Sequence, residues 1–278
     1  MADLWMLYPG GKKKALTLSY DDGVEQDVRL IEIMNHHGLK GTFNLNSGQF
    51  VPEGTVFPAG QIHRRLSEKA VLELYGASGH EVAIHALYHG DLPNLPVSHA
   101  MWQVLRDKEL LENLFHCIVR GMAYPYGTVT PEIAQTLRDC GVAYSRTVES
   151  THRFDVPHDW LRLPATCHHN DPQLMTLARK FVEEKNYRPT LFYLWGHSYE
   201  FEANDNWNVI EEFAEYIGNR DNIWYATNIE IHDYVEAWRS MHLSADGRRV
   251  YNPTAQTLWI EYNGTEYRLE SGYEITLG

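Results

Sequence analysis

The chain has 278 residues, 44% hydrophobic and 22% charged, and its 24 Lys and Arg against 37 Asp and Glu give a net charge of −13. This composition is ordinary for a globular protein, and the length allows one sizeable domain or two small ones. The acidic balance argues against nucleic acid or an anionic membrane as a partner. No stretch approaches the ~20 apolar residues of a membrane span.

Cysteine use and the N-terminal sequence bear on the cellular compartment. Cys117, Cys140 and Cys167 are odd in number and lack C-x-x-C spacing, which indicates neither a disulfide framework nor a thiolate zinc site. The N-terminal residues contain no basic segment followed by an apolar stretch. We therefore expect a reduced, cytoplasmic protein.

Short apolar runs alternate with longer segments of helical period along most of the chain. The helical stretch at 24–37 has its apolar residues on one face and ends at Gly38. Ser67 and Thr130 are suited to cap the next helices, and others are expected from Asp171, from Asn206 and over 228–240. The expected strands are 15–20, 41–46, 81–85, 121–124, 142–147, 190–195 and 223–227.

This alternation predicts an α/β fold with a parallel sheet over residues 1–241. About seven strand–helix units in roughly 240 residues fit a closed barrel better than an open sheet. The pattern changes after that point, because "TLWIEYNGTEYRL" alternates around Asn263-Gly264, a strong hairpin signal. We expect 242–278 to form a small β-hairpin extension.

Polar side chains follow most of the predicted strands. In a strand–helix barrel, functional side chains lie just past the carboxyl ends of the strands, so these residues are predicted to gather at one rim. They are Asp21, Asp22, His85, His89, Tyr124, Tyr126, Arg146 and His197.

His85 and His89 are four residues apart, so on one turn of helix both imidazoles would point the same way and could share a metal. The pair alone is a weak signal, but an aspartate from another strand end completes a two-histidine, one-carboxylate set. The plainer interpretation of Asp21-Asp22-Gly23 is a helix cap and turn. Tyr124–Gly127 would be a rigid turn that can also direct a backbone N–H at an oxyanion.

Together these stretches resemble the polysaccharide deacetylases, carbohydrate esterase family four. "TLSYDDG" is similar to the family's T-F-D-D-G motif, and His85 and His89 match its H-S/T-x-x-H motif. "AYPYG" resembles the R-x-P-Y motif, and His197 resembles the late histidine after a Leu-rich strand. The resemblance spans about residues 15–240 and implies a distorted (β/α)7 barrel.

The resemblance also implies a role for each matching residue. One divalent metal, expected to be zinc with cobalt or nickel as alternatives, would be bound by Asp22, His85 and His89. Asp21 would be the general base that takes a proton from metal-bound water. Tyr126 would offer its backbone N–H to the oxyanion, and His197 would be the general acid.

The sequence departs from the family pattern at three positions. Tyr20 replaces Phe, Ala86 replaces the Ser or Thr after the first ligand histidine, and Ala123 stands where many members have the Arg that orients the base. We expect Arg146 or Arg162 to supply that charge to Asp21 from another strand.

Three further residues stand near the late motifs. Trp160 resembles the tryptophan of the family's fourth motif. For His168 and His169 a surface or loop role is favoured over a catalytic one.

The leading functional hypothesis is a metal-dependent hydrolase that removes acetyl groups from N- or O-acetylated carbohydrate. One alternative is a hydrolase of small cyclic or linear amides on the same barrel. Another is a catalytically weak carbohydrate-binding protein, which the missing Arg and Ser/Thr keep open. Large aromatic side chains beside the site would favour sugars, and a closed pocket would favour small amides.

Overall fold

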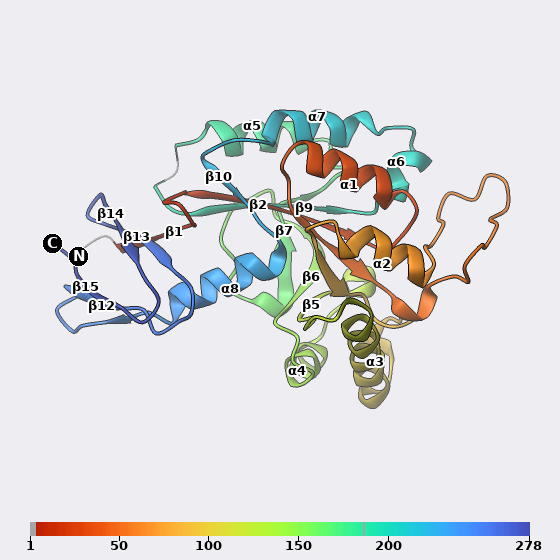
Figure 1. The fold of residues 1–278 in the computed structure, drawn as a ribbon, viewed down its shortest axis with the longest axis horizontal. Coiled ribbons are helices and arrows are strands. Elements are labelled where there is room, and N and C mark those ends of the chain that lie inside the picture. The colour runs from red at the N-terminus through yellow and green to blue at the C-terminus, as the bar shows by residue number, and fades with distance from the viewer. Residues whose placement is uncertain (1–3, 186) are drawn as a thin grey trace.

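The computed structural model describes residues 4–185 and 187–278, and a nine-stranded parallel sheet lies at its centre (Figure 1). The strands pair in the order β7-β6-β5-β4-β3-β2-β9-β8, and β10 also pairs with β2. Their bounds are β2 (Lys14–Asp21), β3 (Gly41–Leu45), β4 (Glu81–Ile84), β5 (Gly121–Ala123), β6 (Tyr144–Ser150), β7 (Leu163–Ala165), β8 (Cys167–His168), β9 (Thr190–Gly196) and β10 (Ile223–Tyr225).

The sheet curls back on itself. Strands β7 and β8 stand at the two ends of the pairing order, yet only Thr166 separates them in the chain. The two edges must therefore meet, and the backbone N–H of Thr166 donates to the carbonyl of Tyr193 in β9 at 2.8 Å. The fold is α/β, a distorted (β/α)7 barrel, as predicted, and all seven predicted strands are present.

Helices surround the sheet, with α1, α5 and α7 side by side along one flank and α3 and α4 on the opposite side (Figure 1). Their bounds are α1 (Asp27–His36), α2 (Glu68–Gly76), α3 (Val97–Phe115), α4 (Pro131–Asp139), α5 (Leu174–Glu183), α6 (Tyr199–Ala203), α7 (Asn208–Ile217) and α8 (Asn228–Arg239). The predicted caps are confirmed, because Ser67 accepts from the N–H of Ala70 and Thr130 from that of Ile133. None of the described helices is long and apolar enough to cross a membrane.

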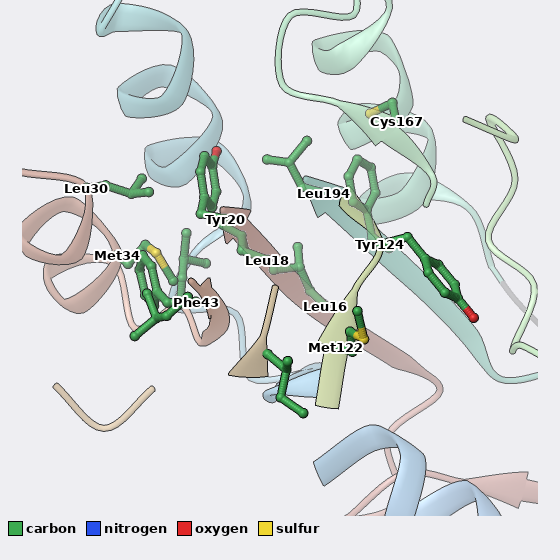
Figure 2. Packing of buried hydrophobic residues seen from close by; sticks show 14 of the residues in the cluster. Leu16, Leu18, Tyr20, Leu30, Met34, Phe43, Met122, Tyr124, Cys167 and Leu194 are labelled. Atoms are coloured by element: carbon green, nitrogen blue, oxygen red, sulfur yellow. The ribbon is translucent and has the colours of Figure 1, made fainter. Parts of the chain in front are cut away.

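Strand β2 is buried along its whole length and is the centre of the core. Its Leu16, Leu18 and Tyr20 pack among Phe43 of β3 and Met34 of α1 (Figure 2). Each such apolar side chain contributes roughly 1.5–3 kcal/mol by leaving water. This packing fixes the end of β2, and with it the position of the two aspartates that follow.

Two small antiparallel sheets lie beside α8 (Figure 1). They are β1-β13-β14 and β11-β12-β15, with bounds β1 (Leu4–Leu7), β11 (His242–Leu243), β12 (Arg249–Tyr251), β13 (Leu258–Tyr262), β14 (Thr265–Leu269) and β15 (Glu274–Thr276). The predicted hairpin is confirmed, because Asn263 and Gly264 link β13 to β14 with positive φ at both positions. Pairing of β1 with β13 joins the N-terminal segment to this region, and a domain boundary at residue 241 stays a prediction.

Candidate active site

Asp21 and Asp22 are adjacent and buried, but the backbone turns sharply between them. Asp21 is the last residue of β2, whereas Asp22 has φ 87° and Gly23 has φ 67°. A non-glycine residue with positive φ costs of order 1–3 kcal/mol, so surrounding contacts must hold it in this conformation. The Asp22 N–H donates to the carbonyl of Asn44 at 2.9 Å, which holds the turn. The two carboxylates therefore have different partners.

Asp21 is held as an ordered anion. Its Oδ1 accepts from the Asn44 side chain at 2.8 Å, and its Oδ2 accepts from Arg146. The Nε2 atoms of His85 and His197 each lie 3.7 Å from the same Oδ2. Burial would raise the pKa of Asp21, but the charge of Arg146, together with His197, outweighs burial and lowers it. Asp21 is thus ionised and available as a proton acceptor.

The arginine beside Asp21 comes from β6, whereas the family motif would place it at position 123 in the neighbouring strand β5. Arg146 in β6 pairs in register with Ala123 in β5, so its guanidinium reaches the barrel mouth at the same level. It is 1% exposed and lies over the Trp195 ring, 4.3 Å from the centroid. The expectation of an arginine partner is confirmed for Arg146, while Arg162 is half-exposed and pairs with Asp159 at 3.5 Å.

Asp22 has two cationic or potentially cationic neighbours that the sequence motifs do not mark. Arg65 Nη2 lies 2.9 Å from its Oδ1, and His63 Nε2 lies 3.0 Å from its Oδ2. Burial would raise the pKa of Asp22, but the hydrogen bond from His63 and the charge of Arg65 hold it far below the usual range. Asp22 is therefore a carboxylate anion at neutral pH.

His85 presents one ring nitrogen without a partner. Its Nδ1–H donates to the carbonyl of Ala123 at 2.8 Å, which leaves the lone pair on the buried Nε2. His85 and His89 lie in a turn rather than on one turn of helix, so that part of the prediction is wrong. Ala86 and His89 have φ 60° and 55°, and this conformation places the two rings 4.8 Å apart.

Asn46 supports the turn at His85 and Ala86. In the family motif, a serine or threonine stands at the position of Ala86. The Asn46 Nδ2 donates to the carbonyls of His85 and Ala86 at 2.5 and 2.6 Å, and its Oδ1 accepts from Arg65 at 2.9 Å. These contacts come from the loop after β3 and support the turn at Ala86.

The three predicted metal ligands meet. Ligand atoms of Asp22, His85 and His89 all lie within 4.8 Å of one another. Burial lowers the pKa of His85, and it lowers that of His89 to about 4, so both rings are neutral at pH 7. A carboxylate with two neutral imidazoles, one with a free buried nitrogen, fits a divalent cation.

A second cluster of potential ligands, His168, His169 and Glu200, also lies within 4.8 Å. The backbone N–H of Asn170 donates to His168 Nδ1 at 3.1 Å, so the neutral ring carries its proton on Nε2. That Nε2 faces Glu200 Oε2 at 3.4 Å and is a donor to it rather than a metal ligand. This arrangement fits a hydrogen-bond network centred on Glu200.

His169 lies in a turn after β8, a loop position as expected, but it is buried and not at the surface. Its ring lies between those of Tyr20 and Phe201, and its Nε2 is 2.9 Å from Glu200 Oε2. Gly196 is required there, because a Cβ would lie 2.0 Å from His169 Nδ1.

Glu200 connects this network to His197, which follows β9. Glu200 Oε1 lies 3.1 Å from His197 Nδ1. Burial would lower the pKa of His197, but Glu200 and Asp21 outweigh burial and raise it. His197 therefore holds its proton more tightly than a free imidazole does, which suits a proton donor. The motifs do not mark Glu200; its only signal is an acidic residue three positions after the histidine.

Tyr126 lies on the other side of His89, with ring centroids 4.7 Å apart. Its backbone is left-handed, at φ 59°, and the turn is closed by Gly127 N–H to the Tyr124 carbonyl at 3.0 Å. Among the described residues, the Tyr126 N–H has no protein acceptor. Trp160 packs against α8 instead, where its Nε1–H donates to Glu236 at 2.7 Å.

Comparisons with known proteins bear on the family and the fold of the chain. Residues 9–145 match the sequence model of the polysaccharide deacetylase family. A protein from Mycobacterium smegmatis assigned to the polysaccharide deacetylases is 17% identical, with 84% of this chain and 94% of that chain covered and a TM-score of 0.60. The Xyl-CE4 domain of a multidomain xylanase from the hindgut metagenome of Trinervitermes trinervoides is 15% identical, covers 81% and 92%, and has a TM-score of 0.52. At these identities the structural likeness concerns the fold, and no curated protein matches the chain significantly.

Proposed function

Because this chain belongs to the polysaccharide deacetylase family, we propose that it is a metal-dependent hydrolase that removes acetyl groups from N- or O-acetylated carbohydrate. The observation that carries the proposal is the set of Asp22, His85 and His89 beside an ionised Asp21. We propose zinc as the metal, with cobalt and nickel as alternatives. When bound there, a divalent cation supplies Lewis acidity, which promotes ionisation of water and polarises the acetyl carbonyl.

Asp21 is the proposed general base. Asn44 and Arg146 each occupy one oxygen of its carboxylate, which fixes the orientation of the group. An anionic carboxylate beside the three ligands can accept the proton of the attacking water. Asp21 is not one of the three residues whose ligand atoms all lie within 4.8 Å of one another, which leaves it free for this role.

His197 is the proposed general acid, and Glu200 is a positioning residue behind it. Glu200 accepts at Nδ1, so the proton to be donated is on Nε2, the nitrogen nearer Asp21. The proton from Nε2 goes to the departing amine or alcohol. The Tyr126 N–H is the proposed donor to the oxyanion that develops on the carbonyl oxygen.

The geometry weakens one reason for considering a catalytically weak binding protein. That interpretation depended on the absent arginine and hydroxyl, whereas Arg146 contacts Asp21 and Asn46 donates to the carbonyls of His85 and Ala86. The remaining alternative is hydrolysis of small amides. It would use the same catalytic groups, so only the choice of substrate distinguishes it from the proposed function.

The experiment is a panel of acetylated sugars and small linear and cyclic amides, assayed with metal-depleted protein before and after addition of Zn, Co or Ni. We expect acetate release from N-acetylglucosamine oligomers or acetylated xylan that depends on metal. The matched control is Asp22→Ala, which should not be rescued by any metal. Turnover of small amides without acetate release from any sugar would overturn the proposal.

A further inference from the structure

Exposed aromatic side chains form a row that leads from the candidate active site onto helix α3. The row consists of Tyr126, Tyr88, Trp102 and His99. Tyr126 is 63% exposed, Tyr88 52% and Trp102 45%, although aromatic rings usually contribute to cores. Single exposed apolar residues are normal on a protein surface, but contiguous ones mark binding sites.

Each step of the row is a contact or a peptide bond. Tyr126 meets the edge of His89, a proposed metal ligand, with ring centroids 4.7 Å apart. Tyr88 precedes His89 in the chain, and its ring lies 6.3 Å from that of Trp102. Trp102 stacks on His99 at 5.3 Å with 21° between the planes. The row is thus continuous with the catalytic groups.

The Tyr88 side chain is held in place although it faces solvent. The backbone N–H of Tyr88 donates to the Gln103 side chain on α3 at 2.9 Å. The Tyr88 ring also packs on the backbone at Gly48, where a Cβ would lie 2.5 Å from its Cε1. Rigid aromatic groups lose little conformational entropy when a ligand binds, which favours binding over a purely accidental exposure.

The chemistry of the row selects the ligand. Among the described residues, the hydroxyls of Tyr88 and Tyr126 and the indole N–H of Trp102 have no protein partner, so each ring offers an apolar face and a free polar group. Sugar rings present C–H faces and hydroxyl edges that match this pair of features. A net charge of −13 disfavours an anionic partner and suits a neutral glycan.

We propose that this row is an extended subsite that binds sugar units of an acetylated oligosaccharide beyond the unit whose acetyl group reacts. The inference rests on the proposed function, because it names a chain of sugars as the substrate. It excludes a small cyclic or linear amide as the best substrate, since such a molecule would not reach Trp102.

The test measures binding and turnover separately, with Trp102→Ala and Trp102→Phe. Alanine suits the exposed helix position, so the fold should persist. With the N-acetylglucosamine hexamer as probe, we expect Trp102→Ala to weaken the Kd of metal-depleted protein about 10-fold, as is typical for loss of one stacking ring. Trp102→Phe should retain most of the affinity. The Kd for monomeric N-acetylglucosamine and the rate with p-nitrophenyl acetate should not change.

The matched control is Tyr273→Ala, which removes an even more exposed aromatic ring (65% against 45%) from the C-terminal region and should leave the hexamer Kd unchanged. Acetate release with identical KM in Trp102→Ala and wild type would overturn the inference and leave the proposed function intact. Hexamer binding that depends on Trp102 without acetate release would uphold the subsite and overturn the proposed function. Absence of hexamer binding, or a dimer that Trp102→Ala dissociates, would also overturn the inference.

Discussion

The guanidinium of Arg146 contacts the carboxylate of Asp21 across the barrel mouth, although the two residues are 125 positions apart in the sequence. Both groups are buried, so neither charge is screened by water. Their pairing lowers the pKa of Asp21 and keeps the carboxylate anionic between two histidines. The proposed base therefore depends on an arginine from a different strand than the family motif would supply.

Arg146→Met should lower kcat about 10- to 100-fold, since it removes the partner that orients the proposed base. Loss of the positive charge raises the pKa of Asp21, so the acid limb of the kcat/KM profile should move to higher pH. The measurement is the pH dependence of acetate release. Arg146→Lys should move the limb less, because the charge remains.

Arg162→Met is the matched control, because Arg162 pairs with Asp159 away from the base. It should leave the acid limb in place. Removing Arg146 also leaves a buried carboxylate unpaired, which costs about 3–5 kcal/mol, so the melting temperature is measured alongside. An unchanged acid limb in folded Arg146→Met would contradict the role given to this ion pair.

The barrel could be predicted from the sequence because its strands are buried runs of apolar residues separated by helical periods. Strands β7 and β8 were outside that prediction because three and two residues are too short to show any period. Helix α3 has no side-chain cap and follows Pro96, so no start signal marks it. The pairing of β1 with β13 joins the two ends of the chain, and such a long-range contact leaves no local pattern.

In the candidate site too, some residues could be predicted from the sequence and others could not. Asp21, Asp22 and the histidine pair lie within short motifs at strand ends, and such positions can be read from one sequence. Arg65, Asn46 and Glu200 act through the folding of separate loops onto those motifs. Their chemistry is common on protein surfaces, so only the three-dimensional contacts distinguish them.

Substitution of the two aspartates should give different results. Asp22→Ala removes a proposed ligand. Metal affinity should therefore fall by at least the ~10–100-fold that is typical when a residue hydrogen-bonded to a ligand is removed. Asp21→Asn retains its size and its bond with Asn44 but cannot accept a proton at neutral pH. It should keep its metal, while kcat falls ~10²–10⁴-fold. Metal content and acetate release are measured on both.

The control for folding is circular dichroism of both variants, since Asp22→Ala leaves Arg65 without its carboxylate partner. Metal-free Asp21→Asn together with metal-loaded Asp22→Ala would mean that the proposed roles are reversed.

Glu200→Gln tests the residue behind the proposed acid. Glutamine can still accept from His197 but has no charge, and Glu200 is a main cause of the raised pKa of His197. The pKa of His197 should therefore fall, and the alkaline limb of the kcat profile should move to lower pH, because the acid loses its proton earlier. kcat at its optimum should fall about 10- to 100-fold.

The matched control is Glu202→Gln, which changes an acidic residue of the same short helix whose carboxylate pairs with Arg64. Its alkaline limb should stay where it is in the wild type. Equal shifts in the two variants would indicate a general effect on helix α6 and not a specific contact with His197.

Asp27 provides a prediction about stability that does not depend on the reaction. It is buried and accepts from Ser198 Oγ at 2.6 Å and from Tyr75 Oη at 2.5 Å. Burial outweighs these bonds and raises its pKa to about 7 from 3.8. Between about pH 4 and pH 7, Asp27 is thus protonated in the folded state but ionised in the unfolded state. This contribution to stability is complete below about pH 4 and is lost as the pH rises through 7.

Asp27→Asn should remove this pH dependence, because an amide does not titrate. The free energy of unfolding from urea titrations at pH 4.5 to 7.5 should decline less steeply than in the wild type, by about 2–4 kcal/mol over the range. Asp221→Asn, at an exposed position, is the control and should follow the wild-type slope. Parallel curves for Asp27→Asn and wild type would show that Asp27 is already ionised in the folded protein, and that its two hydroxyl donors compensate for burial.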